Sequence, residues 1–168
     1  MTQQNWEENI KVHIPRLRRY ARALTNDVSN ADDLVQDCLE RAWDKRQSWT
    51  AGTNLRAWLF TILHNLFING LRRQKIHNEY INQSIASQDI KQHEPNTALR
   101  DLQKCMCQLK PEYREVIILA GLENLTYKEI SDVTGAPIGT VMSRLSRGRQ
   151  ELKLLMSEVD KPKLVSVK

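Results

Sequence analysis

The sequence predicts an all-α protein made of two small helical domains joined by a flexible linker. Apolar residues recur at steps of three and four along most of the chain, which is the spacing of one buried helix face. Only six glycines and five prolines occur among the 168 residues, and this scarcity of turn formers favours helices over sheets. A polar, aperiodic stretch interrupts the pattern, so we expect domains at 1–80 and 98–168 with a linker at 81–97.

The first regular helix is expected to start at Pro15 and to follow the apolar residues as far as Leu24. Proline suits the first turn of a helix because the backbone N–H that it lacks would have no partner there. Ile10 continues the same apolar spacing upstream. Residues 1–14 are therefore expected to form a separate helical piece.

Two further amphipathic helices are expected before the linker. The earlier one follows a turn at 26–27, takes Ser29 or Asn30 as its N-cap and has acids in its first turn. The later one spans residues 54–73 and ends in a basic run.

The second domain contains the pattern of a helix-turn-helix. Thr126 and Glu129 have the spacing of a capping box, which fixes the start of the first helix of the motif. Gly135 can adopt the positive φ needed where that helix ends, and Pro137 cannot continue it but can open the next helix. Pro111 likewise marks the first turn of an earlier helix.

The second helix of this motif is expected to contact DNA. Between Ile138 and Arg149 it has three arginines and no acid. Its buried line is Val141, Leu145 and Gly148, and the residues that lie away from that line are Thr140, Ser143, Arg144 and Arg147. Arginine binds guanine through two hydrogen bonds, while serine and threonine bind phosphates or base edges, so this face suits a DNA major groove. The alternative is a surface helix whose arginines only keep it in solution.

The overall composition points to a polyanionic partner and to the cytoplasm. Lysine and arginine number 25 against 20 acids, a net charge of +5, and the pI is near 9.2. The longest apolar run, 116–122, is far shorter than the ~20 residues of a membrane span, and residues 1–20 lack the apolar core of a signal peptide. Three cysteines form no disulfide framework, which fits a reducing compartment.

No catalytic motif stands out in the chain. P-loop, nucleophile-elbow and zinc-protease motifs are absent, and we expect no enzymatic activity, no cofactor and no metal. Cys105 and Cys107 stand at i and i+2, on different faces of an expected helix, and no second pair of ligands accompanies them. We interpret them as structural thiols, with a redox or metal switch as the alternative.

Four long segments follow one another along the chain. They are ADDLVQDCLERAW, NLRAWLFTILHNLFINGLRR, LKPEYREVIIL and LTYKEISDVTGAPIGTVMSRLSRGRQEL. In this order, and over nearly the whole chain, they resemble the extracytoplasmic-function (ECF, group IV) sigma factors of bacterial RNA polymerase. The resemblance implies a first, region 2-like domain that binds the polymerase clamp and melts and reads the −10 promoter element. It also implies a second, region 4-like domain whose helix-turn-helix reads the −35 element.

The resemblance also implies a polymerase-binding surface in the first domain. An acidic and amide face of the second full helix would meet a basic and polar polymerase surface, and the residues that match it are Asp32, Asp33, Gln36, Asp37 and Glu40. For each single acid, a solvated surface position is the alternative.

Contacts with the −10 element are implied for the loop and helix that follow. Trp49, Phe60 and Asn65 match positions used against single-stranded DNA, where bases stack on aromatic rings and an amide can hold a base edge. Arg56, Arg72 and Arg73 would contact phosphates, with solvated basic ends as the alternative. Trp43 and Trp58 are interpreted as core residues, the latter because it falls on the apolar stripe.

The −35 contacts implied by the resemblance are Thr140, Met142, Ser143, Arg144, Arg147 and Arg149. Met142 stands where many relatives have a basic residue, so that contact is absent or is replaced by an apolar contact with a thymine methyl group. Asn69 stands near a position that is often acidic in relatives. Gly70 is expected to mark fraying of its helix or a close approach.

The implied partners are core RNA polymerase, promoter DNA and an anti-sigma protein that covers the polymerase-binding and DNA-binding faces. The second hypothesis is a stand-alone helix-turn-helix regulator, which would bind free duplex DNA as a symmetric dimer. The motifs of the first domain separate the two hypotheses, because a repressor does not need them.

Overall fold

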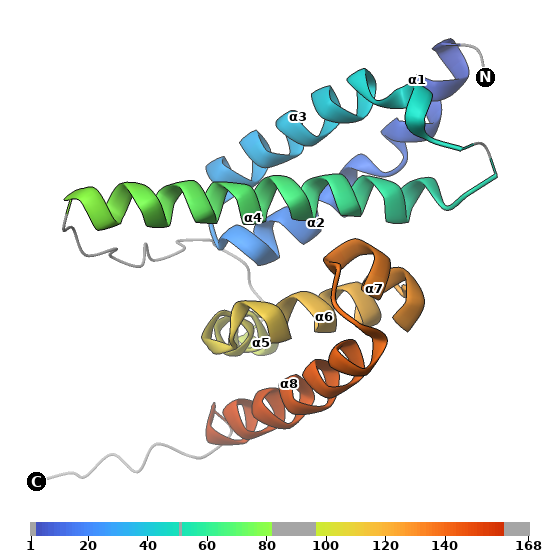
Figure 1. The fold of residues 1–168 in the computed structure, drawn as a ribbon. Coiled ribbons are helices and arrows are strands. Elements are labelled where there is room, and N and C mark those ends of the chain that lie inside the picture. Colours follow the sequence, from blue (N-terminus) through green and yellow to red (C-terminus); the bar gives the residue numbers. More distant parts are fainter. Residues whose placement is uncertain (1–2, 51, 82–96, 160–168) are drawn as a thin grey trace, which may run out of the picture.

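A computed structural model describes residues 3–50, 52–81 and 97–159 of the chain. The described residues form eight α-helices and one 3₁₀ turn and contain no strand, which confirms the predicted all-α class (Figure 1). Most of the predicted linker, 82–96, lies outside the described residues. The elements are α1 (Gln3–Lys11), α2 (Ile14–Thr25), α3 (Val28–Asp44), η1 (Arg46–Ser48), α4 (Leu55–Ile81), α5 (Thr97–Gln108), α6 (Pro111–Gly121), α7 (Tyr127–Thr134) and α8 (Ile138–Val159).

Helices α2, α3 and α4 form the body of the N-terminal domain, with α1 at one end (Figure 1). The buried residues of these helices follow the apolar stripes read from the sequence, and they include Leu17, Leu34, Leu59 and Leu63. The separate N-terminal piece expected from residues 1–14 is α1, and its Trp6 and Ile10 are buried against the same core. The long α4 also packs on α7 of the C-terminal domain.

The start of α3 differs from the prediction. Asn26 has a left-handed backbone, φ 55°, and ends α2. The cap of α3 is Asp27, whose Oδ1 accepts a 2.7 Å hydrogen bond from the backbone N–H of Asn30. The prediction of Ser29 or Asn30 as cap was therefore wrong, and no acid lies in the first turn of the helix. An aspartate competes well with serine for this role because all of these short side chains can reach the same free N–H groups.

Helix α4 is longer than the sequence predicts. Its start agrees with the prediction, because the Oδ1 of Asn54 accepts a hydrogen bond from the N–H of Ala57. Its end does not, since the helix continues through Gly70 to Ile81. A Cβ placed on Gly70 would have no atom within 4 Å, so neither fraying nor a close approach explains this glycine.

The C-terminal domain agrees closely with its predicted motif. Thr126 and Glu129 form both hydrogen bonds of a capping box at the start of α7. Gly135 ends that helix with φ 69°. Pro111 occupies the first turn of α6, while Pro137 precedes α8 and its carbonyl accepts from the N–H of Val141. These signals succeed because each depends only on residues within a few positions of one another.

Gly148 lets α8 cross α6 closely. A Cβ at this position would lie 3.0 Å from the Cβ of Tyr113 and 3.0 Å from the Cδ1 of Ile117. Rotation of its side chain can move the Cδ1 of Ile117, but the Cβ of Tyr113 is attached directly to the backbone and moves only with its helix. The glycine therefore allows the short distance between α8 and α6.

Gly148→Ala and Gly70→Ala are expected to change stability in opposite directions. The first should lower the free energy of unfolding by about 1–2 kcal/mol, because overpacking outweighs the gain in helix propensity. The second should raise it by about 0.5–1 kcal/mol, because alanine there meets open space. Urea unfolding followed by circular dichroism measures both. A Gly148→Ala protein as stable as its Gly70→Ala counterpart would contradict the close crossing.

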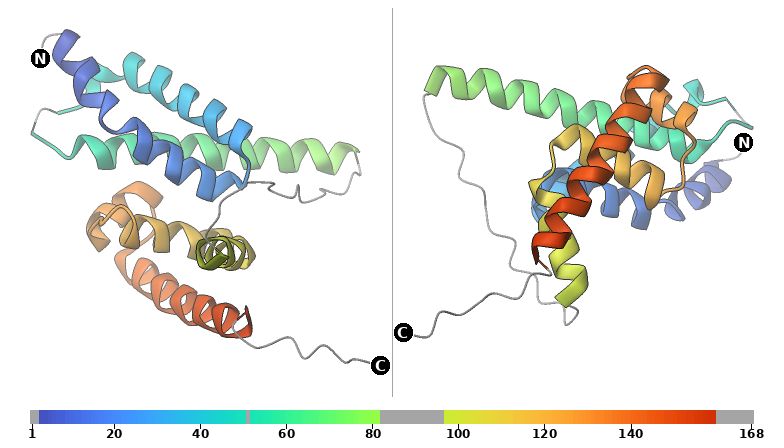
Figure 2. Two further views of the ribbon diagram at one scale, coloured as in Figure 1. Left: turned by 180° about the vertical axis from the view of Figure 1, so that it is seen from behind. Right: turned by 90° about the horizontal axis from the view of Figure 1, so that it is seen from below.

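The two domains lie against each other. Helix α2 packs on α6, and α4 packs on α7. Helix α8 lies on the side of the C-terminal domain that faces away from α2 and α4, as both the front and the turned views show (Figures 1 and 2). The outer side of α8 is thus open to solvent in this arrangement.

Candidate DNA and polymerase interfaces

One side of α8 is buried and the other is open, as a DNA-reading helix requires. Val141 and Leu145 are almost completely buried against α6 and α7, together with Gly148. The six predicted −35 residues lie off this line: Thr140 and Arg144 are half-buried, and Met142, Ser143, Arg147 and Arg149 are exposed. All six thus lie outside the buried line of α8, on an arc that runs from Met142 and Arg149 round to Thr140 and Arg144.

No acidic side chain among the described residues neutralises the positive charge of this surface. No carboxylate within the described residues comes within ion-pair distance of Arg144, Arg147 or Arg149. Met142 is 52% exposed and Ile138, one turn earlier, is 46% exposed. Ile138 was not selected from the sequence, because the first residue of a helix gives no periodic signal. Its exposure beside Met142 adds an apolar contact to a surface that otherwise offers positive charge and hydroxyl groups.

The capping box at the start of α7 orients the helix that supports α8. Burial alone would raise the pKa of Glu129, but hydrogen bonds from the backbone N–H and the hydroxyl of Thr126, and from Asn54, lower it below its usual 4.5. A group with a lowered folded pKa stabilises the fold above its unfolded pKa and loses that contribution as the pH falls through the folded value. Glu129 therefore stabilises the folded domain at neutral pH and loses this contribution progressively as the pH falls below about 4.5.

Thr126→Ala is expected to lower the free energy of unfolding by about 1 kcal/mol at pH 7, since the cap hydroxyl is lost. The wild type is expected to lose further stability as the pH falls below 4.5. This pH-dependent loss should be smaller in the variant, because the hydroxyl hydrogen bond that lowers the pKa of Glu129 is gone. Thermal unfolding across a pH series measures both effects. Thr50→Ala, at an exposed position, is the matched control, and an equal effect of the two changes would contradict the role of the cap.

An acidic face covers the outer side of α3. The five predicted polymerase-binding residues, Asp32, Asp33, Gln36, Asp37 and Glu40, are all exposed. Gln36 donates to the carboxylate of Glu40 at 3.1 Å, and Arg18 lies 3.5 Å from Asp32. Both contacts are at the surface and contribute little to stability. The face is therefore free to meet a basic partner.

The structure divides the six predicted −10 residues into three groups, which are exposed, completely buried and partly covered. Asn65, Arg72 and Arg73 are exposed on α4. Phe60 is completely buried, with its ring edge-on to Tyr20 at a centroid distance of 5.0 Å. In this arrangement no base can stack on Phe60, and its position is that of a core residue.

Trp49 and Arg56, the other two −10 candidates, are partly covered. Trp49 packs beside Trp6 at 5.5 Å, and Trp6 also meets Trp58 at 5.9 Å. Trp6 was not selected from the sequence, although its i, i+4 spacing from the buried Ile10 would have indicated it. Arg56 is half-buried near the domain junction, where its charge helps to lower the pKa of Glu129.

Models of known protein families match both halves of the chain. The family model described as the sigma2 domain of PhyR matches residues 10–64, and that described as sigma-70, region 4 matches residues 99–152. The ECF RNA polymerase sigma factor EcfG of Rhodopseudomonas palustris is 34% identical over 152 residues, which cover 89% of this chain and 83% of that protein. The chain belongs to the ECF sigma factor family. The RNA polymerase sigma factor YlaC of Bacillus subtilis is 28% identical over 90% of this chain and 92% of that protein.

Solved structures agree with this membership. The sigma factor RpoE of Bartonella quintana, crystallised with the anti-sigma factor NepR, has a TM-score of 0.83 and 35% identity, covering 94% of this chain and 99% of that one. CnrH, in complex with the cytosolic domain of CnrY, shares the fold with a TM-score of 0.68 at 22% identity. The fold and family expected from the sequence are confirmed.

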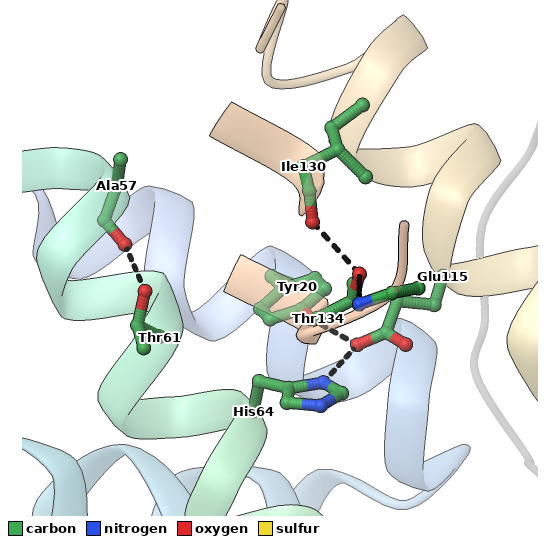
Figure 3. Close-up of polar contacts among 8 residues, drawn as sticks. Tyr20, Ala57, Thr61, His64, Glu115, Ile130 and Thr134 are labelled. Carbon is green, nitrogen blue, oxygen red and sulfur yellow. Dashed lines mark hydrogen bonds and ion pairs between the residues drawn. The ribbon is translucent and has the colours of Figure 1, made fainter. Parts of the chain in front are cut away.

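A buried polar cluster joins the two domains of this sigma factor and was missed by sequence reasoning. Glu115 of α6 accepts a 2.5 Å hydrogen bond from the hydroxyl of Tyr20 and a 2.6 Å hydrogen bond from Nδ1 of His64 (Figure 3). All three residues are more than nine-tenths buried. Burial first, and then the charge and hydrogen bond of Glu115, raise the pKa of Tyr20 well above its usual value, so its hydroxyl remains a donor.

Two further acids of the sigma factor's C-terminal domain meet the N-terminal domain. Glu123, with no exposed surface, accepts from Nε and Nη2 of Arg19 at 3.1 and 2.9 Å, and Arg16 lies 3.6 Å from its other oxygen. Glu129 accepts a hydrogen bond from the amide of Asn54. Sequence spacing contains no signal for these pairs, since Arg19 and Glu123 are 104 residues apart.

Two of the three cysteines of this sigma factor are buried and the third is partly buried. Cys38 and Cys105 are buried, and burial raises the pKa of Cys38 to about 12. Cys107 is partly buried and its thiol donates to Asn26 at 3.1 Å; burial raises its pKa although the charge of Arg114 opposes this. The described residues contain no cluster of three or more groups able to hold a metal ion. The same part of the chain holds no helix both long and apolar enough to cross a bilayer.

Proposed function

We propose that this protein is an alternative sigma factor that binds core RNA polymerase and directs initiation at promoters with defined −10 and −35 elements. The observation that carries the proposal is that one chain combines a region 4 helix-turn-helix, whose arginine face is open, with a sigma2 domain whose acidic face is open on another side. The catalytic chemistry would belong to the polymerase, and this subunit would supply promoter choice in the cytoplasm. The domains proposed for these tasks are 1–80 and 98–168, with 81–97 as linker.

The −35 element would be read by the outer face of α8. Arg144 and Arg147 can each form paired hydrogen bonds with a guanine, and Thr140, Ser143 and Arg149 can hold phosphates. Met142 and Ile138 offer apolar contact to thymine methyl groups.

The −10 element would be held by α4 and the loop before it. Asn65, Arg72 and Arg73 are accessible as the protein stands. Trp49 and Arg56 would become accessible after movement of α1 and of the C-terminal domain, which lie against them. For Phe60 the buried position supports a structural role, and a contact with a base would require larger rearrangement.

The acidic face of α3 would bind the polymerase clamp, where complementary charge speeds association and fixes orientation. We also propose control by an anti-sigma protein. The relative of known structure from Bartonella quintana was solved with such a protein, NepR, and the likeness extends over nearly the full length of both chains.

Arg147→Ala is expected to reduce transcription from a −35-dependent promoter by roughly 5- to 100-fold, the cost of one bidentate base contact. Run-off transcription with core polymerase, on templates with native and scrambled −35 elements, measures this. Lys153→Ala, at an exposed position farther along α8, is the control and should retain activity. The proposal fails if Arg147→Ala is fully active. Binding of free duplex DNA as a dimer, with no effect on polymerase, would favour a stand-alone regulator instead.

A further inference from the structure

The first two turns of α8 expose a pair of large apolar side chains. Ile138 is 46% exposed and Met142 is 52% exposed, and Pro137, the residue before the helix, is exposed as well. Residues four apart on a helix are neighbours, with Cβ atoms about 5–6 Å apart, so Ile138 and Met142 form one apolar pair. Contact of this pair with water costs free energy, which is recovered when a partner covers it.

Gly139 lies within the same turn, and the fold does not require a glycine there. Its φ is not positive, and a Cβ built on it would have no atom within 4 Å. Glycine is nevertheless among the poorest helix formers. A glycine whose side-chain space is empty within its own chain suits the close approach of another molecule to the backbone.

The surroundings of the apolar pair favour DNA as the molecule that covers it. Arg147 and Arg149 are exposed farther along the same helix, and no acid of the described ranges forms an ion pair with either. In a helix-turn-helix, the residues at the N-terminal end of the second helix contact the base edges. Ile138 and Met142 occupy that end of α8.

The chemistry of the pair selects one base. In the major groove thymine presents a C5 methyl group, whereas the other bases present hydrogen-bond donors and acceptors. Base pairs follow one another at 3.4 Å along the duplex. Two side chains about 5–6 Å apart can therefore contact methyl groups on neighbouring base pairs.

We propose that Ile138 and Met142 are specificity-determining residues, which require thymine methyl groups at two neighbouring base pairs of the −35 element, and that Gly139 leaves room for the DNA to reach them. This inference rests on the proposed sigma function and names the chemical group that the start of α8 reads. The arginines farther along the helix select guanine, so the two parts of α8 read different base pairs.

Uracil tests this contact because it differs from thymine only in lacking the methyl group. The −35 element is first defined on a transcribed genomic fragment. Holoenzyme, assembled from core polymerase and the full-length protein, is then titrated with synthetic promoter duplexes in which each thymine of that element is replaced singly by uracil. At two neighbouring base pairs the affinity should fall about 3- to 5-fold, the value of one buried methyl group. An element without neighbouring thymine–adenine pairs, or unchanged affinity at every position, would overturn the proposal.

Ile138→Ala and Met142→Ala assign the methyl contacts to the two side chains. Each variant should bind the thymine promoter about 3- to 5-fold more weakly and should no longer distinguish thymine from uracil at one position. Leu154→Ala is the matched control, because Leu154 is also an exposed apolar residue of α8 but lies more than three turns beyond Met142. If both test variants discriminate against uracil as strongly as this control, the assignment is wrong.

Gly139→Ala separates a DNA contact from a structural role. In the free protein alanine should leave the thermal stability unchanged or raise it, as expected for Gly70→Ala, because neither Cβ would meet an atom within 4 Å. In the holoenzyme it should weaken binding to the −35 element at least about tenfold, since the added methyl group fills space that the DNA needs. Wild-type affinity in this variant would contradict the role of the glycine.

Failure of this inference can be told apart from failure of the sigma function. A wild-type protein that supports no −35-dependent transcription would overturn the sigma function itself. If transcription depends on the −35 element but uracil has no effect, the sigma function stands and only the reading of thymine is overturned.

Discussion

Phe60→Ala is expected to lower the free energy of unfolding by about 3–5 kcal/mol, the usual cost of removing a fully buried aromatic ring. Phe60 has no exposed surface and lies edge-on against Tyr20, so the change leaves a cavity between α2 and α4. An effect of this size is a large part of the total stability of a small protein. Loss of −10 activity in this variant would then follow from loss of structure. Chemical denaturation measures the change directly.

Asn65→Ala is the comparison that separates a DNA contact from a core position. Asn65 is exposed on the same helix, so its removal should change stability by less than about 0.5 kcal/mol. Promoter melting, followed with a fluorescent base in the −10 element, should nevertheless decrease. If Phe60→Ala is as stable as the wild type but fails in melting, the ring is available to DNA and the core assignment is wrong.

Reversing two charges on α3, Asp33→Lys with Asp37→Lys, is expected to weaken binding to core polymerase at least about tenfold. Both carboxylates are exposed and neither forms an ion pair with another described residue, so the fold should be retained. Like charges placed opposite one another across an interface cost several kcal/mol, and 1.4 kcal/mol is already tenfold. Fluorescence titration with labelled core polymerase measures the dissociation constant.

The control for this reversal is Glu7→Lys with Glu8→Lys, two exposed acids of α1 in the same domain. It changes the net charge by the same amount and should leave affinity nearly unchanged. Equal weakening by both pairs would show that net charge, and not the α3 face, determines the affinity.

Local signals in the sequence account for most of the C-terminal domain. The capping box at Thr126 and the left-handed Gly135 depend on neighbours within one helical turn, and both agree with the structure. The cap of α3 was misplaced by two or three positions, because Asp27, Ser29 and Asn30 all can cap and only the three-dimensional turn selects one.

Contacts between residues that are far apart in the sequence could not be predicted from such local signals. Tyr20 and Glu115 are 95 residues apart, and an acid in an amphipathic helix normally faces water. Phe60 was assigned to DNA from the family resemblance, and its place off the predicted apolar stripe of α4 gave no reason to expect burial. A helix packed between two layers buries a second side, and one periodic stripe does not reveal it.

The most direct test of the account is co-elution of the purified protein with bacterial core RNA polymerase, followed by run-off transcription from genomic fragments. The account predicts a stable complex on a sizing column and transcripts that begin at defined promoters only when this protein is present. Elution apart from polymerase, together with an unaided shift of duplex DNA, would contradict it and would make the first domain a dimerisation or sensing module.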